Sequence, residues 1–318
     1  MHGMKIDISL KKNNMKKTLF AFLFLGAGVL TITSCNKNNT EINPPPVNIA
    51  DYIAGNPDFS MMESALVRSG LATQIENATD ITFLLPDNAA LQNAGIDQNY
   101  LNNLSTDDLT QFVLYHEIDK KISSVDFPIS DTISTVSNLH IFSSMNDNGI
   151  FINGILLKQT DIQATNGLVH LLTKALVPPE TTLYNIIAAN PDLTLMKAAI
   201  DKAGLASTLQ NGGKYTVFAP TNTAFNNAGY MTVTDINNAD AAVITKIVKD
   251  QILPTEFFNS DFIAGITLKN LQGDDLLVNA VPPSLSLVGS AQPPSTITTF
   301  DILGTNGVEQ VIDRVILP

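Results

Sequence analysis

The chain has almost none of the residues that build disulfide frameworks or aromatic binding platforms. Its 318 residues include one cysteine and no tryptophan. A lone cysteine has no partner for an internal disulfide, so packing must hold the body together. Aromatic platforms for a sugar could come only from tyrosine and phenylalanine. Hydrophobic residues make up 44% of the chain and there are no blocks of like charge, which indicates a globular body.

Basic residues are also scarce, with 18 Lys and Arg against 30 Asp and Glu. Five of the lysines and one aspartate precede residue 35, which leaves 13 basic and 29 acidic residues beyond it and a net charge of −16. So acidic a surface argues against nucleic acid and anionic lipid as partners.

The most apolar stretch is too short to cross a membrane comfortably. It runs from Leu19 to Ile32, about 14 residues, whereas a transmembrane helix needs roughly 20. Two lysines precede it, and small residues follow it just before Cys35. This is the layout of a secretory signal. We therefore expect residues 1–34 to be a signal peptide, with translation starting at Met15.

The residues Ile32 to Cys35 resemble a bacterial lipobox, with Thr33 and Ser34 in place of the commoner alanine and glycine. The resemblance implies cleavage before Cys35 and lipidation of that cysteine. The alternative is an ordinary residue after an ordinary cleavage site. Several acyl chains would anchor the protein stably. We expect residues 35–47, polar and then proline-rich, to form a tether from the outer membrane, on its periplasmic or cell-surface side.

An internal repeat divides the rest of the chain. Residues 53–95 and 187–229 align without a gap at an offset of 134, and 18 of these 43 positions are identical. The two halves also end alike, in NGLVHLLTKALVP and NGVEQVIDRVILP. This period exceeds the roughly 20–50 residues of solenoid repeats, so it indicates duplicated domains. We place domain 1 at 48–179 and domain 2 at 180–318, each with its own core, joined by a connector short enough to leave them abutting.

Each repeat begins with helical patterns and ends with strand patterns. In domain 1, Pro57 and Gly70 mark the start and end of a helical stretch, and residues 81–86 form a β-rich run. Ser105 to Asp108 predicts a capped helix, and Asp147 to Gly149 predicts a hairpin turn. Helices first and strands late indicate an α+β fold rather than a parallel βαβ fold.

The repeats resemble the fasciclin (FAS1) domain. The run TVFAPTNTAF, from Thr216, is similar to the first signature of that family, and Asn306 to Pro318 is similar to the second. Domain 1 has weaker versions, from Thr82 and from Asn166. The resemblance implies two tandem domains, each a wedge-shaped β-sandwich with flanking helices. It also implies extracellular adhesion or binding rather than catalysis.

Tyr115 and His116 match the Tyr-His motif of the family, where domain 2 has Asp250 and Gln251. The resemblance associates this motif with partner binding. The helical phase suggests a structural role instead. His116 follows Leu109 and its apolar neighbours on one stripe and should point inward, with Tyr115 on the flank.

Domain 2 departs from the pattern over residues 280–298, which contain two Pro-Pro pairs. Proline cannot donate to a strand ladder, so we interpret this stretch as an insertion at the sheet edge. It could serve as a binding loop or be mere packing variation.

The chain shows no catalytic constellation. Of the three histidines beyond residue 35, His116 and His170 lie in apolar runs and suggest buried, hydrogen-bonded side chains rather than metal ligands, and no calcium-loop pattern appears. We expect no enzyme activity, no cofactor and no metal site.

Three functional hypotheses remain. They are an adhesion or protein-binding module at the outer membrane, a glycan-binding accessory lipoprotein of a nutrient-uptake system, and a structural spacer of the envelope. A sugar site would use exposed aromatic rings, for which Tyr100 and Tyr230 are candidates. The partner would be an extracellular protein or glycan.

Replacing the lipidation residue tests the anchor. Cys35→Ala should move the protein from the membrane fraction to the soluble fraction, because the acyl chains have no other attachment site. Cell fractionation with immunoblotting measures this. A variant that stays membrane-bound as strongly as the parent would contradict the lipoprotein hypothesis.

Overall fold

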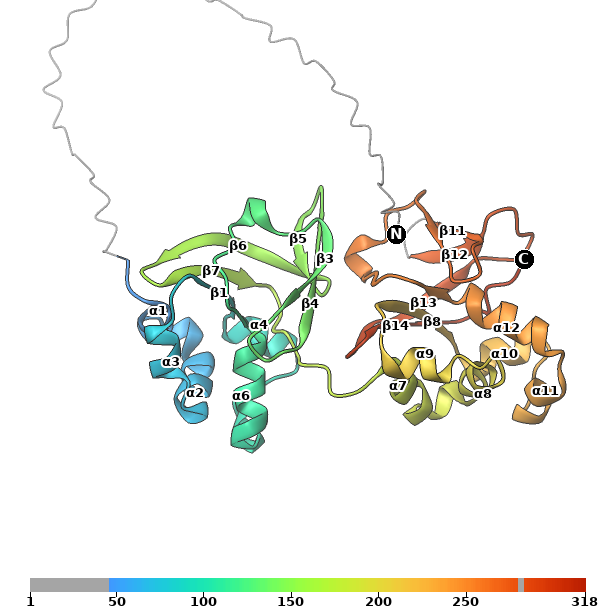
Figure 1. The fold of residues 1–318 in the computed structure, drawn as a ribbon, viewed down its shortest axis with the longest axis horizontal. Coiled ribbons are helices and arrows are strands. Elements are labelled where there is room, and N and C mark those ends of the chain that lie inside the picture. The colour runs from blue at the N-terminus through green and yellow to red at the C-terminus, as the bar shows by residue number, and fades with distance from the viewer. Residues whose placement is uncertain (1–45, 280–282) are drawn as a thin grey trace, which may run out of the picture. The chain divides into compact units, whose positions relative to one another are not determined.

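The structure is a computed structural model that describes residues 46–279 and 283–318, all within one compact unit (Figure 1). Cys35, the signal segment and almost all of the predicted tether lie outside the described residues. Within these ranges no helix is both long and apolar enough to span a membrane.

Domain 1 contains six α-helices and seven strands among its described residues. They are α1 (Ile49–Ala54), α2 (Ser60–Ser69), α3 (Ala72–Asn77), β1 (Ile81–Pro86), α4 (Asn88–Asn93), α5 (Gln98–Asn103), α6 (Thr106–Tyr115), β2 (Glu117–Ile118), β3 (Ser130–Ser134), β4 (His140–Asn146), β5 (Gly149–Ile152), β6 (Ile155–Ala164) and β7 (Gly167–Leu172). Short 3₁₀ helices lie at Pro57–Phe59 and Ser124–Asp126.

Domain 2 repeats this order. Its elements are α7 (Leu183–Ala189), α8 (Thr194–Lys202), α9 (Ala206–Asn211), β8 (Tyr215–Pro220), α10 (Asn222–Asn227), α11 (Val233–Asn238), α12 (Ala241–Asp250), β9 (Ile252–Leu253), β10 (Thr267–Lys269), β11 (Asp275–Val278), β12 (Ser284–Leu287), β13 (Ser295–Gly304) and β14 (Gly307–Ile312). Its 3₁₀ helices are Pro191–Leu193 and Asn259–Asp261.

The seven strands of each domain form one hydrogen-bonded order. It is β2-β1-β7-β6-β5-β4-β3 in domain 1 and β10-β11-β12-β13-β14-β8-β9 in domain 2. The first long strand pairs in parallel with the last one, β1 with β7 and β8 with β14, and the other pairs are antiparallel. The predicted α+β fold and its two tandem domains are confirmed.

Each domain has two apolar cores, one on either face of its central strands. In domain 1, Ile81, Phe83 and Leu85 of β1 belong to the core that the helices share. Leu84 belongs to a second core, with residues of β4 to β7. Burial on both faces explains why the strand is a continuous apolar run rather than an alternating one. In Figure 1 the helices of each domain lie on one side of its strands.

An asparagine before the last strand ties the ends of each domain together. Oδ1 of Asn166 accepts a hydrogen bond from the amide of Ile49 at 2.9 Å, and its Nδ2 donates to the carbonyl of Ile75 at 2.6 Å. Asn306 makes the same two bonds in domain 2, to Leu183 and Leu209, both at 2.9 Å. The first helix, the third helix and the last strand are therefore fixed to one another.

The proline-rich stretch of domain 2 is not an edge insertion, and that prediction is wrong. It contains β12, which pairs with both β11 and β13. The edge strand is β10. Pro293 and Pro294 lie in the loop before β13, and Pro283 immediately precedes β12. None of these prolines therefore has to donate a hydrogen bond within a strand.

Candidate functional site

His116 lies at the end of α6, completely buried. Its Nδ1 donates to the carbonyl of Phe112 at 2.8 Å, and its Nε2 accepts the amide of Leu176 at 3.1 Å. These two bonds fix the neutral ring in one tautomer. Burial lowers the pKa of His116 to about 4, with the bond to Phe112 acting in the opposite direction. The side chain joins the helix to the segment after the last strand.

Tyr115 is also completely buried. It lies off the stripe of Leu109, Phe112 and Val113, which belongs to the other core of domain 1. Its ring belongs to the second core of domain 1. Its hydroxyl donates to the carbonyl of His140 at 3.0 Å and accepts Nδ2 of Asn153 at 2.9 Å. Strands β4 and β5 cover this side of the helix, and the helical phase of α6 alone does not show that cover. Burial raises the pKa of Tyr115.

Domain 2 makes the bonds of His116 with a glutamine. Gln251 donates from Nε2 to the carbonyl of Ile247 at 2.9 Å, and its Oε1 accepts the amide of Ile316 at 3.0 Å. These partners occupy the positions of Phe112 and Leu176 in the repeat. Amide and neutral imidazole each offer one donor and one acceptor at these places.

The second buried histidine shows the same exchange. His170 Nδ1 accepts the amide of Asp161 at 3.2 Å, and Nε2 donates to the carbonyl of Ile122 at 2.9 Å. In domain 2, Gln310 accepts the amide of Asp301 at 3.0 Å and donates to the carbonyl of Phe257 at 3.1 Å. The fold thus needs a donor–acceptor pair at both positions and does not need a histidine.

Three buried glutamates differ from these histidines, and no motif in the sequence marks them. Glu117, Glu256 and Glu309 each have at least one buried carboxyl oxygen without a hydrogen-bond partner. Burial, as the first cause, raises the pKa of each to about 7. Leaving such a group unpaired costs about 1–3 kcal/mol.

The repeat shows that the fold does not require these carboxyls. Ile252 and Val169, both fully buried, occupy the positions of Glu117 and Glu309 in the opposite domain, and Lys121 occupies that of Glu256. This alignment is the sequence signal that could have identified them. The positions at which the repeats differ in this way are candidates for function.

An open groove occurs in each domain, beside the long helix and the end of the repeat. Groove 2, in domain 2, has a volume of about 530 Å³ and is lined by Tyr230, Val243, Ile247 and Leu317, with Lys246 and Asp250 at its polar end. Groove 1, in domain 1, has about 580 Å³, and its lining includes Tyr100, Asp108 and Gln111.

The two candidate sugar-binding tyrosines therefore lie in corresponding grooves but in different domains. Asp108 in groove 1 is replaced by the half-exposed Val243 in groove 2. As a result, groove 2 is the more apolar of the two.

The two domains also contact each other. Phe142 of domain 1 stacks on Phe258 of domain 2, with ring centroids 5.7 Å apart, and Val308 packs with them. Nδ2 of Asn146 donates to the carbonyl of Ser260 at 2.8 Å.

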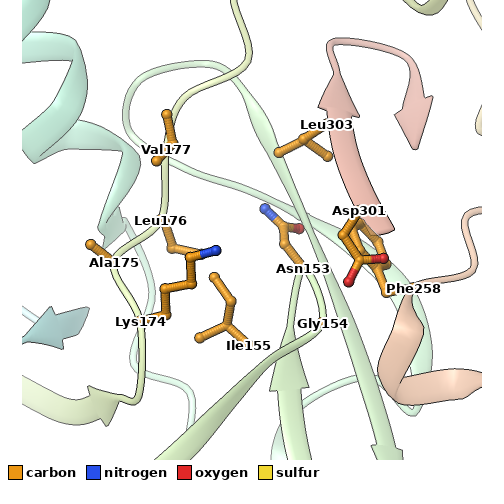
Figure 2. Close-up of a pocket in the computed structure, with 10 residues that line it drawn as sticks. All are labelled: Asn153, Gly154, Ile155, Lys174, Ala175, Leu176, Val177, Phe258, Asp301 and Leu303. Carbon is orange, nitrogen blue, oxygen red and sulfur yellow. The ribbon is translucent and has the colours of Figure 1, made fainter. Parts of the chain in front are cut away.

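A pocket of about 210 Å³ lies beside this contact, with a lining from both domains. Figure 2 shows the amino group of Lys174 and the carboxylate of Asp301 on opposite sides of it. Burial raises the pKa of Asp301, against the hydrogen bond from Gln310. Among residues 46–279 and 283–318, no group of three or more His, Cys, Asp or Glu side chains is arranged to hold a metal ion.

Comparisons with known proteins give a consistent result. A family model for the fasciclin domain matches residues 57–178 and 191–318. The transforming growth factor-beta-induced protein ig-h3 of Sus scrofa is 27% identical over 253 residues, which are 78% of this chain and 36% of that protein. Human periostin is 27% identical over 255 residues, 79% of this chain and 30% of that protein.

A bacterial relative and a solved structure complete the comparison. The immunogenic protein MPB70 of Mycobacterium bovis is 29% identical over 134 residues, 41% of this chain and 65% of that protein. The solved FAS1 domain pair of the insect cell adhesion molecule fasciclin I has a TM-score of 0.40 and 17% identity, with 83% of this chain and 98% of that chain covered. The chain spans about a third of the length of ig-h3 and periostin.

Replacing His116 distinguishes a structural role from a contact role. His116→Ala leaves the Phe112 carbonyl and the Leu176 amide unpaired and opens a cavity, so we expect a loss of about 3 kcal/mol in the free energy of unfolding. His116→Gln should cost less than about 1 kcal/mol, since Gln251 fills this place in domain 2. Denaturant unfolding measures both.

The stability of domain 1 should depend on pH, because the pKa of His116 is lowered in the folded state. The folded state binds fewer protons than the unfolded state, so the stability that neutral His116 contributes is complete above the unfolded pKa of about 6.5. It is lost as pH falls through the folded pKa of about 4. His116→Gln should remove this acid sensitivity.

An unchanged melting temperature in His116→Ala, together with lost partner binding, would show that His116 is a contact residue instead.

Glu309→Val should stabilise domain 2. Because the pKa of Glu309 is raised to about 7 in the fold, its contribution to stability is most favourable below the unfolded pKa and falls as pH rises toward 7. The variant should gain about 3 kcal/mol at pH 8 and much less at pH 5. Urea unfolding at both pH values tests this, with Val169→Ile as the control. An equal effect at both pH values would contradict burial of an ionisable carboxyl.

Proposed function

The chain belongs to the fasciclin family, and from this premise we propose that it is a lipid-anchored binding or adhesion protein of the bacterial envelope rather than an enzyme. Cys35 would carry the lipid at the outer membrane, and the two domains would engage a partner on its periplasmic or extracellular side. The adhesive character is the one that membership of the fasciclin family implies.

Groove 2 is the observation that supports a protein partner. Its lining is mainly apolar and includes Val243, which is 48% exposed, beside Tyr230 and Leu317. An exposed apolar surface with a polar rim is typical of protein interaction sites. Lys246 supplies the rim, where it is paired with Asp250 at 2.9 Å and with Asp274 at 2.7 Å.

Groove 1 favours a second candidate, a glycan-binding accessory lipoprotein. Tyr100 is 43% exposed there and lies near Asp108 and Gln111. A ring face beside polar acceptors and donors suits a sugar. The spacer hypothesis has no comparable observation in its favour.

An adhesion assay with oriented protein tests the proposal. Residues 35–318 can be coupled to beads through Cys35, the only cysteine, in the orientation that the lipid would impose. We expect these beads to retain whole cells or envelope fragments of the same organism. Val243→Asp should reduce retention at least tenfold, because a charge then enters the apolar groove.

The control is Val67→Asp on α2, since Val67 is likewise exposed, at 65%, and lies outside both grooves. The aspartate in Val243→Asp lies in the first turn of α12, where the helix dipole favours it. Equal retention by the two variants would contradict the role of groove 2. The glycan candidate would be favoured if free oligosaccharide abolished retention while Val243→Asp left it unchanged.

A further inference from the structure

A hollow in domain 1 surrounds one of the unpartnered carboxyls. It has a volume of about 640 Å³ and lies between α3, the start of β1 and the chain around β2. Glu117 and Asp119 line it together with four polar side chains, those of Thr73, Gln74, Asn77 and Thr79. We call it the Glu117 hollow. It is separate from groove 1 and from the contact between the domains.

Glu117 is 3% exposed, and its Oε2 has no hydrogen-bond partner. Asp119 lines the same hollow, and its negative charge adds to the effect of burial in raising the pKa of Glu117. Neither acid forms an ion pair within residues 46–279 and 283–318, so together they form an unsatisfied acceptor site. A positively charged group with several donors would satisfy it.

The second repeat shows that the fold alone does not call for these acids. Ile252 has the same backbone environment as Glu117. Each pairs with the central β1 or β8 strand in the same register, and the carbonyl of each accepts an amide from a later loop, Val136 at 2.8 Å or Leu271 at 2.7 Å. Pro254 follows in the position of Asp119. Domain 2 thus has the scaffold without the two acids.

The other lining groups restrict the ligand. The hollow contains no aromatic side chain, which disfavours a stacked sugar ring. Its amide and hydroxyl oxygens can accept the additional N–H donors that a guanidinium presents in a planar fork. The strongly acidic chain would also attract a basic partner at long range.

We propose that the Glu117 hollow receives an arginine or lysine side chain of a protein partner, with Glu117 and Asp119 accepting hydrogen bonds from its cationic group. This rests on the proposed binding function and adds the chemistry of the partner. It assigns the basic contact to domain 1, while groove 2 provides the apolar contact in domain 2.

Titration with small probes tests the hollow directly. A glycine-serine peptide with one central arginine is added to ¹⁵N-labelled residues 36–318, and the amide shifts of Glu117 to Asp119 and of α3 are followed by NMR. The same peptide with citrulline is the neutral control of equal shape. We expect the arginine peptide to bind, the citrulline peptide to bind at least tenfold more weakly, and Glu117→Ile to lose at least tenfold in affinity.

Glu309→Val is the matched protein control. It also replaces a buried, unpartnered carboxyl by the residue of the opposite repeat, but Glu309 does not line this hollow. It should leave arginine binding unchanged. Equal binding of arginine and citrulline peptides, or full binding by Glu117→Ile, would overturn the proposal.

Two further titrations distinguish a protein side chain from other cations as the ligand of the hollow. Calcium chloride that shifts the same amides and displaces the peptide would mean an inorganic cation site. Free arginine amide that binds tenfold more tightly than the peptide would mean a small soluble cation. Both results overturn the protein partner. If the bead assay fails while the arginine peptide binds as expected, the hollow stands and the adhesion proposal fails.

Discussion

Parallel pairing of the first and last long strands is the constraint on which each domain depends. In domain 1 it runs without a break from Ile81 against Gly167 to Pro86 against Leu172. These two strands separate the helical core from the second core, so their pairing sets both. Such a pairing joins residues far apart in the chain, so closing it costs conformational entropy that the two cores must offset.

The polar side chains that support this arrangement are interchangeable between the domains when their hydrogen bonds are kept. His116 and Gln251 are one such pair, and His170 and Gln310 are another. Each connects a buried carbonyl to a buried amide that would otherwise lack a partner. The duplicated chain therefore contains its own control. A polar residue whose hydrogen bonds recur in both domains stabilises the fold. A buried carboxyl without hydrogen-bond partners, at a position where the other domain has an aliphatic residue, needs another explanation.

The sequence was sufficient to predict the α+β class, the tandem domains and their family, because an ungapped repeat constrains both copies at once. It also predicted that His116 points inward, since Leu109, Phe112 and Val113 define the helical stripe. The burial of Tyr115 was not predicted, because its cover comes from strands far along the chain, and only the tertiary fold brings them over the helix. The proline-rich stretch was misplaced because Pro283 and Pro294 flank strands rather than lie within them.

The candidate site was less accessible to prediction. Glu117 follows the Tyr-His motif directly and has no motif of its own, and its burial without a partner depends on α3 and β1 closing around it. The equivalence with Ile252 could have been read from the sequence, but the hollow could not. Lipidation at Cys35 and the location at the outer membrane stay predictions from the signal segment.

Gly167→Ala tests the central constraint most directly. A Cβ at Gly167 would collide with the carbonyl of Ile81, so the variant must separate β1 from β7, at a cost of about 3 kcal/mol or more. Gly70→Ala is the control, because Gly70 has a left-handed backbone with open space around it and should cost only about 1 kcal/mol. We expect Gly167→Ala also to abolish hydrogen-exchange protection in β1 and β7 while domain 2 stays protected. An unfolding free energy and an exchange pattern equal to those of Gly70→Ala would contradict the account.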